Sequence, residues 1–190
     1  MKFLYGKQEF SSMERSRESG WLLTNGLGGF SSMTIAGEAS RNDHAVLMAC
    51  TKAPNYRVNV VHRLQESLSA GKESTFLSTQ QFAEEPAEEG WKHLSFMEVD
   101  GLPRWDFDWQ GIRVEKKMAM VHGENTVAVQ YRLCNHTSQS CTLRVRPWMQ
   151  FAPKGEDLAP ETEFLVQEDT VVAAGLQLRV VTNGLLTEEP

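Results

Sequence analysis

Apolar and polar residues alternate along most of the chain that follows a glycine-rich stretch near residue 28, and a period of two is typical of strands with one buried face. Val58 and Val60 follow this pattern, and it recurs in later segments separated by turn residues. The apolar positions of those later segments are Trp105, Phe107, Trp109, Ile112, Val114, Met118, Val127, Val129, Tyr131, Leu133, Leu143, Val145, Leu176, Leu178 and Val180. Turns are predicted at 110–111, 123–125 and 174–175. The pattern predicts an all-β fold, an antiparallel β-sandwich.

No segment shows a sustained helical period with caps at both ends. The one stretch that could be helical, 80–90, carries a Glu-rich run around Pro86, which favours a solvated loop. Near the end, 180–182 is predicted as a strand, Asn183-Gly184 as a turn and 185–187 as the start of a returning strand. We therefore expect residues 1–190 to form a single sandwich domain cut from a longer polypeptide.

The stretch WLLTNGLGGFSSMTIAG places Gly26, Gly28 and Gly29 within four positions. A dinucleotide fingerprint would need a glycine or alanine at Ser31 and a helix after it, whereas 32–35 is typical of a strand. A phosphate-binding P-loop would need a Gly-Lys-Ser/Thr that does not follow. The cluster therefore favours a turn between two strands or a surface that another part approaches closely.

Charge and composition exclude several classes of function. The formal net charge of −6 disfavours nucleic-acid partners, and apolar runs such as 45–50 are too short to span a membrane. The start of the chain lacks a signal-peptide core, so we expect a soluble cytoplasmic protein. If 127–134 and 141–145 form a hairpin, Cys134 and Cys141 face each other at the base of its loop, within reach of a disulfide, although reduced thiols are favoured in the cytoplasm.

Candidate chemistry is sparse. The five histidines show no metal-ligand spacing, and neither a metal nor another cofactor is expected. Asp106 and Asp108 share a strand face that could present paired carboxylates, but a solvated face opposite the aromatic stripe is the simpler interpretation. The stripe itself, Trp105, Phe107 and Trp109, is predicted to be core rather than a sugar platform, because its period matches the other buried faces.

The segment RESGWLLTNGLGGFSSMTIAGEASRNDHAVLMA resembles the opening of bacterial and archaeal glycogen debranching enzymes, with a Thr-Asn-Gly-Leu-Gly-Gly-aromatic string followed by a Gly, an Arg and a His at matching positions. The matching residues are Trp21, Leu22, Thr24, Asn25, Gly26, Leu27, Gly28, Gly29, Phe30, Gly37, Arg41 and His44. The segment DGLPRWDFDWQGIRVEKKMAMVHGENTVAVQYRL and the later Arg146-Pro147 are also similar to that family.

The resemblance implies an N-terminal β-sandwich of the supersandwich type, which precedes a glucoamylase-like helical barrel that cleaves α-1,6-linked glucose. This chain would contain only the first part, so it is predicted to be inactive alone, because glycoside hydrolysis needs two positioned carboxyl groups. The implied partners are the C-terminal catalytic domain and glycogen or a related α-glucan. The rival hypothesis is a free-standing β-sandwich that binds glucan or another protein.

The resemblance also suggests a set of substrate-binding or domain-interface residues: Asn25, Gly26, Gly28, Gly29, Arg41 and His44. The alternative is a compact turn in which Asn25 caps the loop backbone. The sequence departs from the family at two loops. Asn42, Asp43 and Ala45 replace an Arg, a Tyr and a Gly, and 151–155 replaces a Phe-Arg-Asp-Tyr-His stretch, which removes hydrogen-bond donors and a stacking ring.

Overall fold

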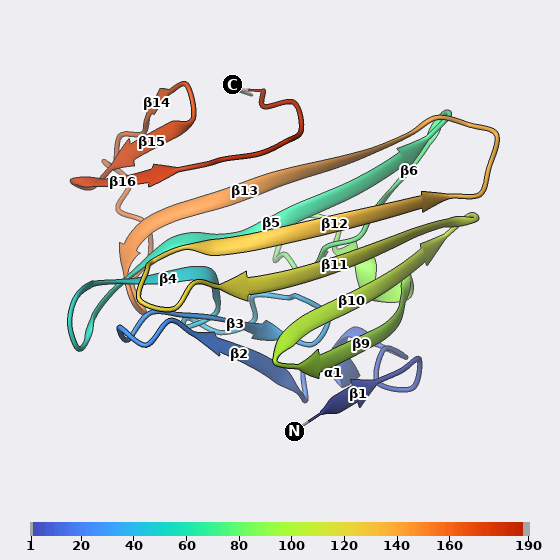
Figure 1. Cartoon of the computed structure of the whole chain (residues 1–190), viewed down its shortest axis with the longest axis horizontal. Helices are drawn as coiled ribbons and strands as arrows, with labels where there is room; N and C mark the ends of the chain where they lie inside the picture. Colours follow the sequence, from blue (N-terminus) through green and yellow to red (C-terminus); the bar gives the residue numbers. More distant parts are fainter. Residues whose placement is uncertain (1, 188–190) are drawn as a thin grey trace.

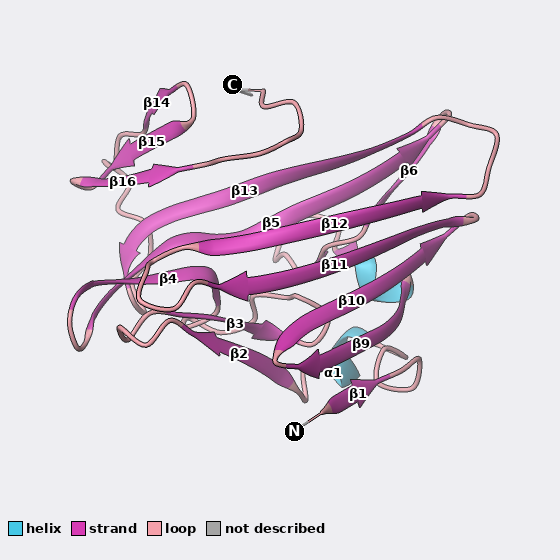
Figure 2. Ribbon diagram, in the orientation of Figure 1, coloured by secondary structure: helices cyan, strands magenta, loops and turns pink. Residues whose placement is uncertain are grey.

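The computed structural model describes residues 2–187 as two stacked antiparallel sheets, with smaller elements at their margins (Figure 1, Figure 2). Sheet A has the strand order β1-β9-β10-β11-β12. Its strands are β1 (Phe3–Tyr5), β9 (Leu94–Asp100), β10 (Leu102–Trp109), β11 (Ile112–Met120) and β12 (Val127–Asn135). The predicted all-β antiparallel sandwich is confirmed.

Sheet B has the order β13-β5-β4-β3-β2, and β6 pairs with the second half of β5. Its strands are β2 (Gly20–Thr24), β3 (Phe30–Thr34), β4 (Ala45–Lys52), β5 (Tyr56–Ala70), β6 (Glu73–Phe76) and β13 (Cys141–Pro153). The remaining elements are α1 (Met13–Ser16), β7 (Thr79–Gln80), β8 (Glu88–Glu89), η1 (Gly90–Lys92), β14 (Leu165–Gln167), β15 (Thr170–Ala173) and β16 (Leu176–Arg179). Strands β14, β15 and β16 form a separate small sheet beside β13 (Figure 1).

The core lies between the two sheets, where the predicted alternation buries one face of each strand. Trp105 and Phe107 of β10 are buried, and the Trp105 ring meets Trp21 of β2 edge to face at 5.3 Å. The aromatic stripe is therefore core, as predicted, with Trp109 half-buried at its end. Residues 110 and 111 both have positive φ, the geometry of a tight hairpin turn that the Gln-Gly pair predicts.

A buried ion pair crosses the interior between the sheets. Lys116 of β11 contacts Glu66 of β5 at 2.6 Å, and the hydroxyl of Tyr131 on β12 donates to the same carboxylate. Burial, reinforced by the negative charge of Glu66, raises the pKa of Tyr131 well above its ordinary value. All three groups stay paired, which is the condition under which buried charges are tolerated.

Three predictions need correction. The predicted hairpin between 127–134 and 141–145 does not form, because β12 pairs with β11 in sheet A whereas β13 pairs with β5 in sheet B. The intervening loop passes from one sheet to the other, and Cys134 and Cys141 are free thiols. A polar loop between two alternating segments has the same sequence signature in both arrangements.

The strands predicted at 180–182 and 185–187 are also absent. The last strand, β16, ends at Arg179, and residues 180–187 are irregular. The stretch 80–90 is a loop in its middle, as predicted, but its ends are the short paired strands β7 and β8. Among residues 2–187 we find no helix that is long and apolar enough to cross a membrane.

Candidate functional site

The glycine-rich turn, residues 25–29, joins β2 to β3 and is organised around the side chain of Asn25. Its Oδ1 accepts hydrogen bonds from the backbone N–H groups of Leu27 and Gly29, both at 2.9 Å. Its Nδ2 donates to the carbonyl of Glu124 at 2.9 Å and to Oδ1 of Asn125 at 3.0 Å. Asn25 is fully buried, so its hydrogen bonds are directed within the molecule.

Each glycine of the turn faces a neighbour that a side chain would strike. A Cβ at Gly28 would lie 2.6 Å from the carbonyl oxygen of Pro54, and a Cβ at Gly29 would lie 2.6 Å from Nδ2 of Asn25. Gly26 and Gly28 also have left-handed φ values of +78° and +97°. Glycine is needed at these positions because L side chains rarely adopt that conformation and because no room remains for one.

Asn125, in the turn between β11 and β12, fastens the two sheets at this end of the sandwich. Besides meeting Asn25, its Oδ1 accepts from the backbone N–H of Cys50 and its Nδ2 donates to the carbonyl of Cys50. Gly123 donates its N–H to the carbonyl of Asn25 at 2.7 Å. The turn of sheet B, the turn of sheet A and strand β4 are thus tied together by backbone and amide groups.

The outer surface of this end carries three exposed apolar side chains among polar ones. Leu27 at the tip of the glycine-rich turn is 41% exposed, Val121 of the β11–β12 turn 38%, and Tyr56 of the β4–β5 turn 58%. These three turns lie at the same end of the sandwich (Figure 1). The internal hydrogen bonds of the turn therefore hold an exposed leucine in a fixed position.

Arg41 and His44 lie apart from the glycine-rich turn. They border the other end of the β2–β3 hairpin, where Gly20 pairs with Thr34, whereas the turn follows the Thr24–Phe30 pair. Five-residue strands separate the two ends by roughly 15 Å. The structure thus divides the six predicted site residues into two groups.

The second group belongs to two adjoining cavities that we call the polar groove. The smaller, about 300 Å³, is lined by Arg17, Ser19, Gly20, Trp21, Leu22, Ser32, Thr34, Arg41 and His44. The larger, about 710 Å³, is lined by Arg17, Glu38, Ala39, Ser40, Arg41, Asn42, His62, Gln80, Gln81, Gln150 and Asp157. The two cavities share Arg17 and Arg41.

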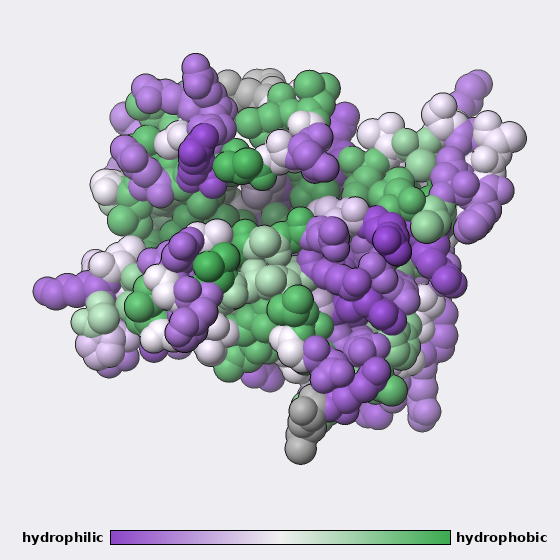
Figure 3. Space-filling view, viewed as in Figure 1, coloured by the Kyte–Doolittle hydropathy of each residue, from purple (hydrophilic) through white to green (hydrophobic). Residues whose placement is uncertain are grey.

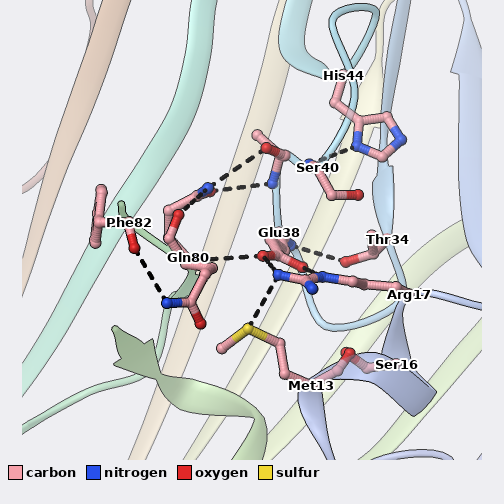
Figure 4. A network of polar contacts seen from close by, with 11 residues as sticks. Met13, Ser16, Arg17, Thr34, Glu38, Ser40, His44, Gln80 and Phe82 are labelled. Carbon is pink, nitrogen blue, oxygen red and sulfur yellow. Dashed lines mark hydrogen bonds and ion pairs between the residues drawn. The ribbon is translucent and has the colours of Figure 1, made fainter. Parts of the chain in front are cut away.

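An ion pair forms the floor of the polar groove (Figure 4). The guanidinium of Arg17 binds both oxygens of buried Glu38 at 2.6 Å, and this hydrogen bonding raises the pKa of Arg17 above its ordinary value. The N–H of Glu38 donates to Oγ1 of Thr34 and the N–H of Gln81 donates to Oε1 of Glu38. The side-chain amide of Gln80 joins the network through two hydrogen bonds with the backbone of Ala39, one accepted and one donated. Hydrogen bonds thus hold the walls of the polar groove in place.

Both histidines of the polar groove are neutral at neutral pH. Burial lowers the pKa of His44, and burial together with the nearby Arg63 lowers the pKa of His62. Nδ1 of His44 accepts from the N–H of Ser40, so the neutral ring carries its proton on Nε2. Nδ1 of His62 pairs with Nδ2 of Asn59, a donor, which fixes the same tautomer.

The family model described as glycogen debranching enzyme N terminal matches residues 19–184, which is most of the chain. The chain belongs to this family. No curated protein and no solved structure gives a significant match.

The other candidate residues of this debranching-enzyme N-terminal domain lie away from both groups. Asp106 and Asp108 are on the outer face of sheet A, on the opposite side of β10 from Trp105, and Asp108 pairs with Arg113 at 3.1 Å. Within residues 2–187 no group of three or more His, Cys, Asp or Glu side chains is arranged to hold a metal ion.

Sequence reasoning missed Asn125 and most of the lining of the polar groove. The pattern predicts Asn125 only as part of a turn, and Asn is common in turns whether or not it bridges two sheets. Arg17, Gln80 and Gln150 come from three distant parts of the chain and share no motif. The resemblance to the family marks Arg41 and His44 but gives no signal for their neighbours.

Proposed function

We propose that this chain acts as a non-catalytic N-terminal domain of a glycogen debranching, amylo-α-1,6-glucosidase-like enzyme in the cytoplasm. Its role is to support a helical catalytic domain of the same polypeptide and to contribute to contact with an α-glucan. The family match over residues 19–184 carries this proposal. The free-standing sandwich that binds glucan or protein is the alternative, favoured by the open polar groove.

Exposed apolar side chains support the docking role. Of the exposed large hydrophobic residues among 2–187, seven follow residue 157: Leu158, Phe164, Leu165, Val166, Val181, Leu185 and Leu186. In Figure 3, hydrophobic surface also gathers between the β14–β16 lobe and β12. Contiguous exposed apolar surface is typical of an interaction site, so the C-terminal third offers an area on which a second domain can pack.

The glycine-rich turn supplies a second, smaller contact in this proposal. Asn25, Gly26, Gly28 and Gly29 fix the backbone, and Leu27 is the side chain that they present to the neighbouring domain. Arg41 and His44 face the groove and would contact glucan rather than the catalytic domain. The two parts of the predicted site thus take two different roles.

The carboxylates of the polar groove support a non-catalytic role. Glycosidases position two carboxyl groups about 5–10 Å apart on either side of the bond that they cleave. Glu38 is buried, and each of its oxygens accepts a hydrogen bond from the guanidinium of Arg17. Asp157 is exposed in the loop after β13. In this proposal, cleavage comes from the partner domain.

The test is to express this chain with the polypeptide encoded after it and to measure glucose release from a branched limit dextrin. We expect the downstream part alone to be unstable or weakly active, and the chain to restore activity when supplied in trans. Leu27→Asp should weaken that restoration, whereas Leu102→Asp, similarly exposed but on sheet A, should not. A downstream part that is fully stable and active alone, or a reading frame that encodes no helical domain, would contradict the proposal.

A further inference from the structure

We propose that the polar groove binds a run of several α-linked glucose residues in the isolated chain, with Arg41 and Gln81 as hydrogen-bonding residues and Trp148 as a stacking platform. The choice of α-linked glucose rests on the proposed function. The groove and its lining are formed by residues of this chain.

The charges of the polar groove favour an uncharged ligand. Two cations, Arg17 and Arg41, are matched by two carboxylates, Glu38 and Asp157. A phosphate site would carry an excess of cations, and a metal site an excess of carboxylates. Balanced charge leaves hydrogen bonding as the main means of recognition.

The neutral part of the lining consists largely of amides. Asn42, Gln80, Gln81 and Gln150 each carry a donor and an acceptor on one planar group. Sugar hydroxyl groups also donate and accept. Gln80 is bound to Ala39, and Gln150 to Asn59 and Glu156, which leaves Asn42 and the Oε1 of Gln81 as the amide groups of this lining that are open to a sugar. His62 adds a donor, because its neutral ring carries the proton on Nε2.

The length of the polar groove favours an oligosaccharide over a single sugar. The smaller cavity is lined by β2 and β3, and the larger reaches β5 and β13 at the far edge of sheet B. Four strand spacings separate β2 from β13, which amounts to roughly 19 Å. One hexose ring fills only a fraction of that span.

An aromatic platform lies beside the larger cavity. The guanidinium of Arg63 lies 5.1 Å from the ring centre of Trp148 and 5.3 Å from that of Phe82. Neither ring is among the residues that line the cavity, but Trp148 stands two residues before Gln150 on β13, and Phe82 directly follows Gln81.

The platform is held rigidly. Arg63 is itself buried and fixed by two hydrogen bonds to Glu88, at 2.8 and 2.9 Å. Trp148 nevertheless remains 46% exposed. A fixed, partly exposed indole ring can stack on the apolar face of a sugar at little entropic cost.

The experiment is a titration of the 190-residue chain with maltoheptaose, followed by amide chemical shifts and by calorimetry. We expect saturable binding with shifts concentrated at residues of the polar groove. Arg41→Ala and Gln81→Ala should each weaken binding at least about fivefold. Both residues are exposed, and the Arg41 side chain makes no hydrogen bond or ion pair with the described residues, so the fold should persist.

Trp148→Ala is expected to weaken binding about tenfold through loss of the stacking contact, and Trp148→Phe should retain most of the affinity. Arg132→Ala, an exposed change on β12, is the matched control and should leave the affinity unchanged. Cellohexaose, with β-linkages, should bind at least about tenfold more weakly than maltoheptaose.

Absence of maltoheptaose binding, equal binding of cellohexaose, or unchanged affinity in all three groove variants would overturn the inference. None of these outcomes bears on the restoration of activity in trans, which tests the proposed function through Leu27 and the catalytic partner. If the chain binds maltoheptaose but does not restore activity in trans, the result would favour the alternative, a free-standing module that binds glucan through the polar groove.

Discussion

The two ends of the β2–β3 hairpin use polar groups in opposite ways. At the glycine-rich turn, Asn25 directs its hydrogen bonds to backbone and amide groups of the same molecule. At the polar groove, Arg41, Asn42 and Gln81 are exposed. The most specific motif of the sequence therefore marks a point where the two sheets are fastened, and the surface open to a ligand is made mostly by residues without a motif, Arg41 and His44 excepted.

The difference has a physical cause. A turn that two other segments approach within van der Waals distance tolerates almost no substitution, so its sequence becomes distinctive. A groove wall needs only polar side chains of roughly suitable length. Substitutions at the two ends should accordingly differ in their effect on stability, and that difference can be measured.

The largest effect is expected for Gly28→Val. Its φ of +97° is strained for a β-branched residue, and the new Cβ would lie 2.6 Å from the carbonyl oxygen of Pro54, a backbone atom. We expect a loss of at least about 4 kcal/mol in the free energy of unfolding, measured by urea denaturation. Gly37→Ala is the control: φ there is +80° but no atom lies within 4 Å, so about 1 kcal/mol is expected. Equal losses at the two positions would show that close packing is not what requires glycine at 28.

Asn25→Ala should cost about 2–4 kcal/mol. The change removes the acceptor of two backbone N–H groups and the donor to Glu124 and Asn125, in a site that water does not reach. Chemical denaturation with and without the change gives the value. Asn42→Ala, at the exposed groove, should stay within about 0.5 kcal/mol. A stable Asn25→Ala variant would mean that the turn keeps its shape without its central amide.

Arg17→Gln should cost about 2 kcal/mol, because it leaves the buried carboxylate of Glu38 without its cation. Arg17 is itself about one-third exposed, and solvent screening keeps the loss below that of a fully buried pair. The comparison variant is Arg15→Ala, which breaks the exposed pair with Glu18 and should change the unfolding free energy by less than about 0.5 kcal/mol. If the two variants were equally stable, the floor of the polar groove would not depend on its ion pair.

Most strands could be predicted from the sequence because the period of two is visible within the residues of each strand. Trp105 and Phe107 alternate with aspartates, and a period of two needs no knowledge of the neighbouring strands. The turn at Gln110-Gly111 was predictable for the same local reason. The strands wrongly predicted after Val180 show the limit, since a short apolar run forms a strand only when a partner strand lies beside it.

Local sequence patterns do not show which distant segments pair with each other. Whether the chain after β12 folds back beside it or continues into the other sheet depends on the whole sandwich, and the polar residues between β12 and β13 fit both. The buried ion pair of Glu66 and Lys116 could not be predicted either, because in the sequence each residue resembles an ordinary surface charge. The polar groove exists only once Arg17, Gln80 and Gln150 have been brought together.

The smallest expected effect is a pH dependence of the free energy of unfolding, to which the two histidines of the polar groove contribute. Burial lowers the pKa of His44 and of His62, so between these lowered values and the unfolded value of about 6.5 the unfolded chain binds more protons. Stability should therefore be full above pH 6.5 and fall as the pH drops below it, by at most about 1.4 kcal/mol per pH unit for each histidine.

Glu88 titrates outside this window. Burial alone would raise its pKa, but hydrogen bonds from Arg63, Ser78 and Gln65 hold it below 4.5, so its contribution is lost only at lower pH. Denaturation curves between pH 5.5 and 7.5 thus isolate the histidines. Burial also lowers the pKa of His93, which lies outside the groove, so His44→Gln with His62→Gln should remove the groove's share of the slope and His93→Gln should remove the rest. A slope left unchanged by the double change would place the titrating groups outside the polar groove.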